Sequence, residues 1–125
     1  MTQEEKELLI KDLSSSLPYG VIVQYTAGDG ETLLDCYLDA VSVMSQCVSI
    51  AELGSTHFVW REIGQVKPYL RPMSSMSEEE YAEYCKYVWC GYVQDTVDYL
   101  NSIHVDYRGL IGNGLALVAP EEMYK

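Results

Sequence analysis

Four residues with charged or polar side chains lie close together near the C-terminus: His104, Asp106, Tyr107 and Arg108. Glycines follow them and would let a ligand or a second chain approach the backbone closely. The guanidinium of Arg108 is expected to pair with Asp106 or with the carbonyls of a helix end; alternatively, it anchors a ligand or a partner protein. A pocket near His104 and Arg108 would suit a small-molecule binder or an enzyme.

The rest of the chain offers little support for catalysis. His57 lies in an alternating aromatic run, which indicates packing, and His104 lies at the end of an expected helix, where an imidazolium would interact favourably with the helix dipole. There is no Gly-x-Ser-x-Gly motif, and the glycines at 109, 112 and 114 lack the Gly-Lys-Ser/Thr of a phosphate loop. We therefore expect no enzymatic activity and no cofactor.

The cysteines also fail to form a metal-binding pattern. No Cys-x-x-Cys occurs, and the four thiols are scattered along the chain: Cys36, Cys47, Cys85 and Cys90. Because Cys85 and Cys90 fall where core residues are expected, we predict buried free thiols, with a zinc site or a redox role as the alternatives.

Acidic residues dominate the charge of the chain. It has 8 Lys and Arg against 19 Asp and Glu, a formal net charge of −11. Such a surface repels nucleic-acid phosphates and anionic membranes, so we expect no direct binding to either. The charge would instead serve solubility, docking on a basic protein or, in the extreme, mimicry of a nucleic acid.

Tyrosine is unusually frequent, with 11 residues against one Phe and two Trp. Tyrosine suits half-buried surfaces and interfaces because its ring packs while its hydroxyl finds a polar partner. Tyr and Arg also dominate interface energetics. The candidate interaction residues are therefore Tyr69, Arg71, Asp106, Tyr107 and Arg108.

The elements that position these residues can be read from the apolar pattern of the chain, which indicates a single domain over residues 1–125. Thr2 and Glu5 form a capping-box pattern before a helix at 2–15, which Pro18 terminates. Alternating apolar residues predict an antiparallel β-rich part at 19–66, with strands near 19–25, 32–38 and 57–63 and one or two short strands within 40–50. This part would form a small curved sheet, such as an SH3-like partial barrel.

The second half of the chain changes character at residues 67–76, where two prolines predict a stiff strap that is neither helix nor central strand. Ser77 and Glu80 then form a second capping box, opening a helical part at 77–104 that is interrupted at Gly91 and capped again at Asp95. Its apolar stripe is Tyr81, Tyr84, Cys85, Val88 and Tyr92. Residues 105–125 should form a turn and a short strand at 115–118. The fold class is therefore α+β.

Residues 66–76, 99–116 and 119–124, together with the start of the chain, resemble a group of small proteins from gut Bacteroides-type bacteria and their phages or prophages. The stretch KPYLRPMSSM is the most specific part, and residues 27–62 are the least similar. No activity is established for that group, so the resemblance implies a reducing cytosol and a mobile genetic element but no function. The acidic N-terminus is also unlike a signal peptide, and we expect a cytoplasmic protein.

These observations favour a non-enzymatic accessory module that binds another protein. One alternative is an inhibitor of host defence that mimics nucleic acid, which requires carboxylates concentrated on one face. A second is a small-molecule binder with a pocket near His104 and Arg108. A third is a homo-oligomeric structural component.

Overall fold

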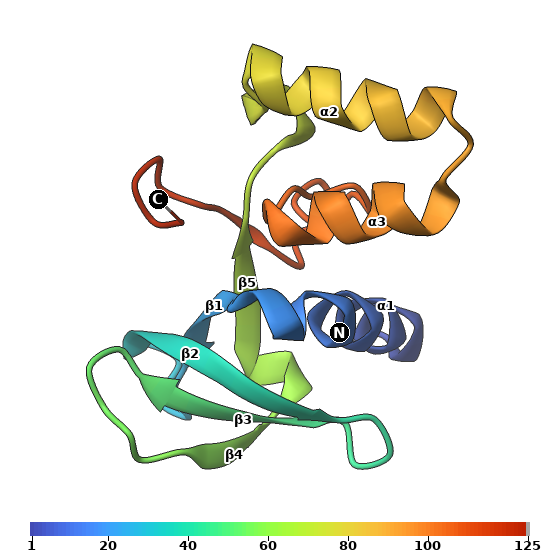
Figure 1. Ribbon diagram of the computed structural model, residues 1–125. Coiled ribbons are helices and arrows are strands. Elements are labelled where there is room, and N and C mark those ends of the chain that lie inside the picture. The colour runs from blue at the N-terminus through green and yellow to red at the C-terminus, as the bar shows by residue number, and fades with distance from the viewer. Residues whose placement is uncertain (125) are drawn as a thin grey trace.

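The computed structural model describes residues 1–124 and confirms the α+β class (Figure 1). Helix α1 spans Gln3–Ser16 and begins with the predicted capping box. Thr2 Oγ1 accepts a hydrogen bond from the Glu5 amide at 3.1 Å, and the Glu5 carboxylate accepts one from the Thr2 amide at 2.9 Å. Pro18 lies in the 3-10 turn Leu17–Tyr19 that follows the helix, as expected from its effect on the preceding residue.

Six strands form one sheet in the order β4-β3-β2-β1-β5-β6. Their bounds are Ile22–Thr26 (β1), Leu33–Ser42 (β2), Cys47–Glu52 (β3), Val59–Glu62 (β4), Val66–Leu70 (β5) and Leu117–Val118 (β6). The pairings among β1–β5 are antiparallel, whereas β6 pairs parallel to β5. The sheet is therefore mixed and not purely antiparallel as predicted.

The sheet is strongly curved but does not close into a barrel. The Arg61 guanidinium of β4 lies 5.5 Å from the ring centroid of Tyr25 in β1, although two strands separate β4 from β1. Helix α1 fills the face on which this contact occurs. The main core combines that helix with the sheet and the C-terminal turn, and its fully buried side chains include Leu9, Leu13, Val21, Val23, Val48, Ile50, Val66, Leu70 and Leu110.

The prediction that residues 67–76 form a strap outside the sheet is wrong for its first part. Residues 66–70 are strand β5, which lies between β1 and β6, and Pro68 pairs with Val23. Main-chain groups alternate between the two sides of a strand. The main-chain groups of Leu70 point towards β6, because its carbonyl accepts a hydrogen bond from the Ala119 amide at 2.8 Å. Pro68 is two residues earlier in the strand, so its nitrogen points towards the same side. Pairing with β6 begins only at Tyr69, and the missing N–H of Pro68 therefore costs no ladder bond.

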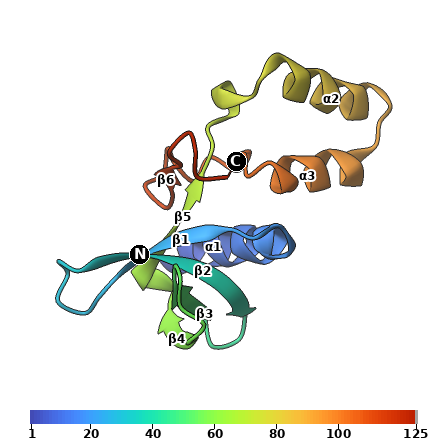
Figure 2. The same ribbon diagram turned by 60° about the vertical axis from the view of Figure 1, so that its left-hand side comes forward.

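Helices α2 (Glu78–Trp89) and α3 (Val93–Ser102) follow a 3-10 turn at Met73–Ser75. The capping box of Ser77 and Glu80 is confirmed, and Gly91 separates the helices with a φ of 71°. Asp95 is not a cap, because α3 begins at Val93 and Asp95 lies inside its first turn. Both ribbon views show α2 as the outermost element, with α3 between it and the rest of the molecule (Figures 1 and 2).

The chain after α3 returns to the sheet through a turn and the predicted short strand, β6. Val105 forms a parallel bridge with Arg71, which extends the β5 ladder by one residue. No helix within residues 1–124 combines the length and the apolar character needed to cross a membrane.

Candidate functional site

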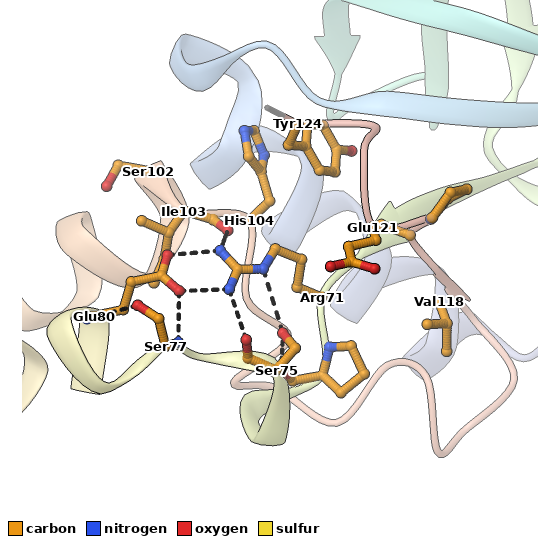
Figure 3. A pocket seen from close by; sticks show the side chains of 13 residues that line it. Arg71, Ser75, Ser77, Glu80, Ser102, Ile103, His104, Val118, Glu121 and Tyr124 are labelled. Carbon is orange, nitrogen blue, oxygen red and sulfur yellow. Dashed lines mark hydrogen bonds and ion pairs between the residues drawn. The ribbon is translucent and has the colours of Figure 1, made fainter.

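Arg71, a predicted interaction residue, links the end of β5 to both C-terminal helices (Figure 3). Its Nη1 and Nη2 donate to the two carboxylate oxygens of Glu80 in α2, at 2.8 and 2.6 Å. Nη1 also donates to the Ile103 carbonyl at 3.2 Å, while Nη2 and Nε donate to the carbonyl and the hydroxyl of Ser75 at 3.0 and 3.3 Å. The guanidinium is thus occupied by contacts within the chain.

Glu80 takes part in two arrangements at once. Its carboxylate accepts from Arg71 and from the Ser77 amide at 2.9 Å, so it closes both the ion pair and the capping box. The hydrogen bonds from Arg71, reinforced by Ser77 and opposed by partial burial, lower the pKa of Glu80 to about 2.

Arg108 is held in an internal ion pair with Asp12 of α1. Its Nη1 lies 3.1 Å from Asp12 Oδ1, and the two side chains are 14% and 4% exposed. The expected pairing of Arg108 with Asp106 or with helix carbonyls is therefore wrong. Burial raises the pKa of Asp12 to about 6 despite the opposing attraction of Arg108, and Asp12 Oδ2 is buried without a hydrogen-bond partner.

The other three predicted interaction residues also bond within the chain. Asp106 accepts from the amides of Leu110 and Ile111, both at 2.9 Å, and so shapes the turn after Arg108. The Tyr107 hydroxyl donates to Asn101 Oδ1 at 3.0 Å. The Tyr69 hydroxyl donates to Asp35 Oδ1 at 2.6 Å and accepts from Gln24 at 3.1 Å, which links three neighbouring strands. Each of the five has a clear structural role.

His104 is packed rather than poised for proton transfer. Its ring stacks on that of Tyr124 with centroids 3.7 Å apart, and the residue is 8% exposed with Nδ1 buried and unpartnered. Burial, together with the nearby charge of Arg71, lowers the pKa of His104 to about 4. The expected imidazolium at the helix end is therefore wrong: the ring is neutral at pH 7.

A cavity of about 810 Å³ opens beside His104 (Figure 3). It lies between the end of α3, the segment after β5 and the C-terminal segment, and its lining includes Arg71, Glu80, His104 and Tyr124 but not Arg108. Two of the three serines on its wall, Ser75 and Ser102, donate their hydroxyls to main-chain carbonyls, each at 2.6 Å, and the Ser77 hydroxyl accepts from the Glu80 amide at 3.1 Å. The cavity therefore combines an ion pair and an imidazole with apolar parts of its wall.

Helix α2 presents an apolar face that the rest of the described chain leaves largely uncovered. We define the α2 apolar face as the exposed or half-buried side chains of Tyr81, Tyr84, Cys85, Val88 and Trp89, together with Tyr92 just beyond the helix end. None of the residues of α2 is buried, and Trp89 is 88% exposed. The stripe predicted from the sequence therefore does not pack into the core, and its Tyr81, Val88 and Tyr92 are exposed. The helix instead contacts α3 through its other side, where the rings of Tyr87 and Tyr99 lie 5.7 Å apart.

The cysteines follow the same division between core and surface. Cys36 is buried, Cys47 and Cys85 are half-buried, and Cys90 is exposed. The prediction of buried thiols thus holds for Cys36 and is wrong for Cys90. No group of His, Cys, Asp and Glu residues that could hold a metal ion occurs within residues 1–124.

A second set of exposed rings lies on the outer face of the sheet. Tyr37 and Trp60 are each more than one-third exposed, and the register places Tyr37 beside Ala51 and Trp60 beside Ser49. Ala51 and Ser49 are buried, so these rings contribute to the fold by covering the small residues of β3.

Sequence reasoning missed three residues that organise the site: Asp12, Glu80 as the partner of Arg71, and Tyr124. The Tyr124 hydroxyl accepts from the Ile22 amide at 3.0 Å and donates to the Tyr69 carbonyl at 2.6 Å, joining β1 and β5. A polar residue on the apolar side of the first helix was the only available signal, and it pointed to Asp12.

No protein-family model matches the chain, and neither the curated proteins nor the solved structures contain a significant match.

Proposed function

We propose that the protein is a non-enzymatic accessory module that binds another protein through the α2 apolar face. The observation that carries this proposal is that α2 has no buried residue, although it displays the exposed apolar side chains Tyr81, Val88 and Trp89. Contiguous exposed apolar surface of this kind is typical of interaction sites in folded proteins.

The fold itself does not require these side chains. Helix α2 is held by Glu80 to Arg71 and by Tyr87 to Tyr99, on a different side of the helix. Exposed Trp and Tyr residues incur an energetic cost in water that a partner would relieve, and they are the residue types that most often dominate binding energy.

The partner that fits this face has an apolar centre surrounded by positive charge. The chain carries a net charge of −11, and Glu78 and Glu79 are exposed at the start of α2. These charges attract a basic surface and repel a second copy of the same chain. A single helix also offers less area than a stable homodimer normally buries. The resemblance at residues 66–76 directs the search to proteins of a Bacteroides-type host or its phages.

The proposal is tested by affinity capture from nuclease-treated host lysate, followed by reconstitution of binding with the purified partner. The test variant is Val88→Ser/Trp89→Ser. The matched control is Val43→Ser/Met44→Ser, which removes two exposed apolar side chains from the turn between β2 and β3. Because all four side chains are exposed, neither double variant should unfold the protein.

We expect the wild type and the control variant to retain the same basic protein. The Val88→Ser/Trp89→Ser variant should bind that protein at least about tenfold more weakly, as for the loss of a Trp hot spot. Equal retention by all three proteins would rule out the α2 apolar face as the site. Retention of an acidic protein would contradict the charge argument.

A second candidate function, small-molecule binding, is favoured by the cavity beside His104. Its volume of about 810 Å³ is within the range of ligand pockets, and the net charge of the protein favours a neutral or cationic ligand. A thermal-shift series with benzamidine, benzamide and benzoate tests this idea, since the three compounds share a ring and differ in charge. The small-molecule hypothesis is supported if benzamidine and benzamide raise the melting temperature of the wild type but not that of Ser102→Trp, in which the indole would fill the cavity. It is contradicted if none of the three compounds stabilises the wild type.

A further inference from the structure

We infer that the partner of the α2 apolar face is a single amphipathic helix that lies antiparallel to α2 and carries Lys or Arg at its C-terminal end. This inference rests on the proposed function, because it specifies what binds at the same site. Three features of α2 lead to it: the shape of the face, the distribution of charge along the helix, and the direction of the helix dipole.

The α2 apolar face has the shape that a helix fits. Tyr81, Cys85 and Val88 recur at spacings of four and three, which places them in one row along the helix, with Tyr84 and Trp89 on either side and Tyr92 beyond the helix end. Rows of this kind pack against the rows of a second helix. A peptide that binds by adding a β-strand would need an open strand edge, and α2 lies apart from the sheet, with α3 in between (Figure 2).

Negative charge is concentrated at one end of this face. Glu78 is exposed in the first turn of α2 and lies on the same side of the helix as Cys85 and Trp89, seven and eleven residues farther on. Glu79 and Glu83 lie on the opposite side of the helix, and Glu80 is paired with Arg71. The unit charge of Glu78 exceeds the partial positive charge of the helix N-terminus, which is about half a unit charge. A helix docked on the α2 apolar face therefore meets a carboxylate at the N-terminal end of α2 and none farther along the face.

The helix dipole then selects the orientation. Lys or Arg in the last turn of a helix stabilises that helix, whereas the same residues in its first turn destabilise it. In an antiparallel complex the last turn of the partner lies beside Glu78, so a cation in that turn gains both from the partner's own helix dipole and from this carboxylate. In a parallel complex the cations near this end of α2 would lie in the first turn of the partner, where the attraction of the carboxylate is opposed by the partner's own helix dipole.

The test uses three synthetic amphipathic peptides of about 14 residues, roughly the length that spans α2. All three peptides share one row of leucines. The first peptide carries lysines in its last two turns, and the second carries them in its first two turns. The third peptide is the first one with its lysines replaced by glutamates. Binding is followed through the emission of Trp89 in a Trp60→Phe background, so that burial of the 88%-exposed indole reports docking.

We expect the peptide with C-terminal lysines to bind about two- to fivefold more tightly than the other two, as for one exposed ion pair. Salt at about 0.5 M should reduce this preference, since it screens exposed charges. Glu78→Gln should abolish the preference but retain binding, whereas Glu79→Gln, on the opposite side of the helix, should leave the preference unchanged. Tyr81→Ser/Val88→Ser should abolish binding of every peptide.

The contradicting outcomes separate this inference from the proposed function. Equal affinity for all three peptides overturns the charge and orientation argument but leaves protein binding at α2 intact. The inference is also overturned, and the proposed function kept, if no peptide binds while binding of the lysate protein is still lost in Val88→Ser/Trp89→Ser. The partner is then not a single amphipathic helix. If neither peptides nor a lysate protein bind, or if light scattering shows a dimer that Val88→Ser/Trp89→Ser dissociates, both proposals are overturned.

Discussion

Arg71 and Glu80 are joined by two hydrogen bonds of 2.6 and 2.8 Å, which tie the end of β5 to the first turn of α2. The same guanidinium bonds the Ile103 carbonyl just beyond α3, so one side chain connects the sheet with both helices that follow it. Helix α2 has no buried residue of its own, and its position relative to the sheet depends strongly on this pair.

Replacing Glu80 by Gln should therefore loosen α2 more than the sheet. Gln keeps an acceptor for the Ser77 amide but loses the charged bidentate contact, so we expect a loss of about 1–2 kcal/mol in the free energy of unfolding. Urea denaturation measures this loss, and hydrogen exchange should accelerate in α2 while the amides of β1–β3 remain protected. Glu79→Gln, an exposed neighbour, should change stability by less than about 0.5 kcal/mol; an equal effect of both variants would contradict the role of the pair.

The Glu80 pair should also contribute to acid sensitivity. Because the pKa of Glu80 is lowered from 4.5 to about 2, its stabilising effect is present above pH 4.5 and is lost as the pH falls towards 2. In Glu80→Gln, stability should fall less steeply between those values than in the wild type. Parallel curves for the two proteins would show that Glu80 titrates normally.

Asp12 should have the opposite pH dependence. Its pKa is raised from 3.8 to about 6, so the protonated form favours the folded state, and this contribution is complete below pH 3.8 and lost as the pH rises through 6. The difference between the unfolding free energies of the wild type and Asp12→Asn should therefore change by up to about 3 kcal/mol across that interval. Carboxyl-carbon NMR checks the cause directly, because Arg108→Met should move the pKa of Asp12 further upward. A pKa near 4 in the wild type would contradict this assignment.

Local features of the sequence predicted local features of the fold. Both capping boxes, at Thr2/Glu5 and Ser77/Glu80, depend on residues three apart and are present as expected. The β1–β2 hairpin follows from alternation on either side of a turn, and its register places Tyr25 opposite Leu34. These elements were predictable because the interactions that specify them lie within a few residues.

Pairings between distant segments could not be predicted in the same way. Arg108 lies 96 residues from Asp12, and nothing near either residue indicates their contact. The stripe on α2 has the same spacing as a core helix, so the sequence pattern does not distinguish a face covered by its own fold from one left open. Pro68 suggested a break, and only the position of β6 explains why a proline is tolerated there.

His104 should make the protein less stable in acid. Because its pKa is lowered from 6.5 to about 4, the neutral ring favours folding above pH 6.5, and this contribution is lost as the pH falls through 4. His104→Asn removes the imidazole and suits the positive φ of 61° at this position. The variant should show a shallower loss of stability between pH 6.5 and 4. Imidazole NMR in a His57→Asn background gives the pKa of His104 itself, and a value near 6.5 would contradict the predicted burial effect.

The hydroxyl of Tyr124 supports the sheet where β1 and β5 leave a gap in their ladder. It accepts from the Ile22 amide and donates to the Tyr69 carbonyl, so Tyr124→Phe would leave both main-chain groups without that partner. We expect a loss of about 1–3 kcal/mol in the free energy of unfolding, as for an unsatisfied part-buried amide. Exchange of the Ile22 amide should accelerate at the same time, while the ring of the new Phe still stacks on His104. Tyr92→Phe, which alters an exposed tyrosine, is the matched control. If the two variants are equally stable, the C-terminal segment does not hold these strands together.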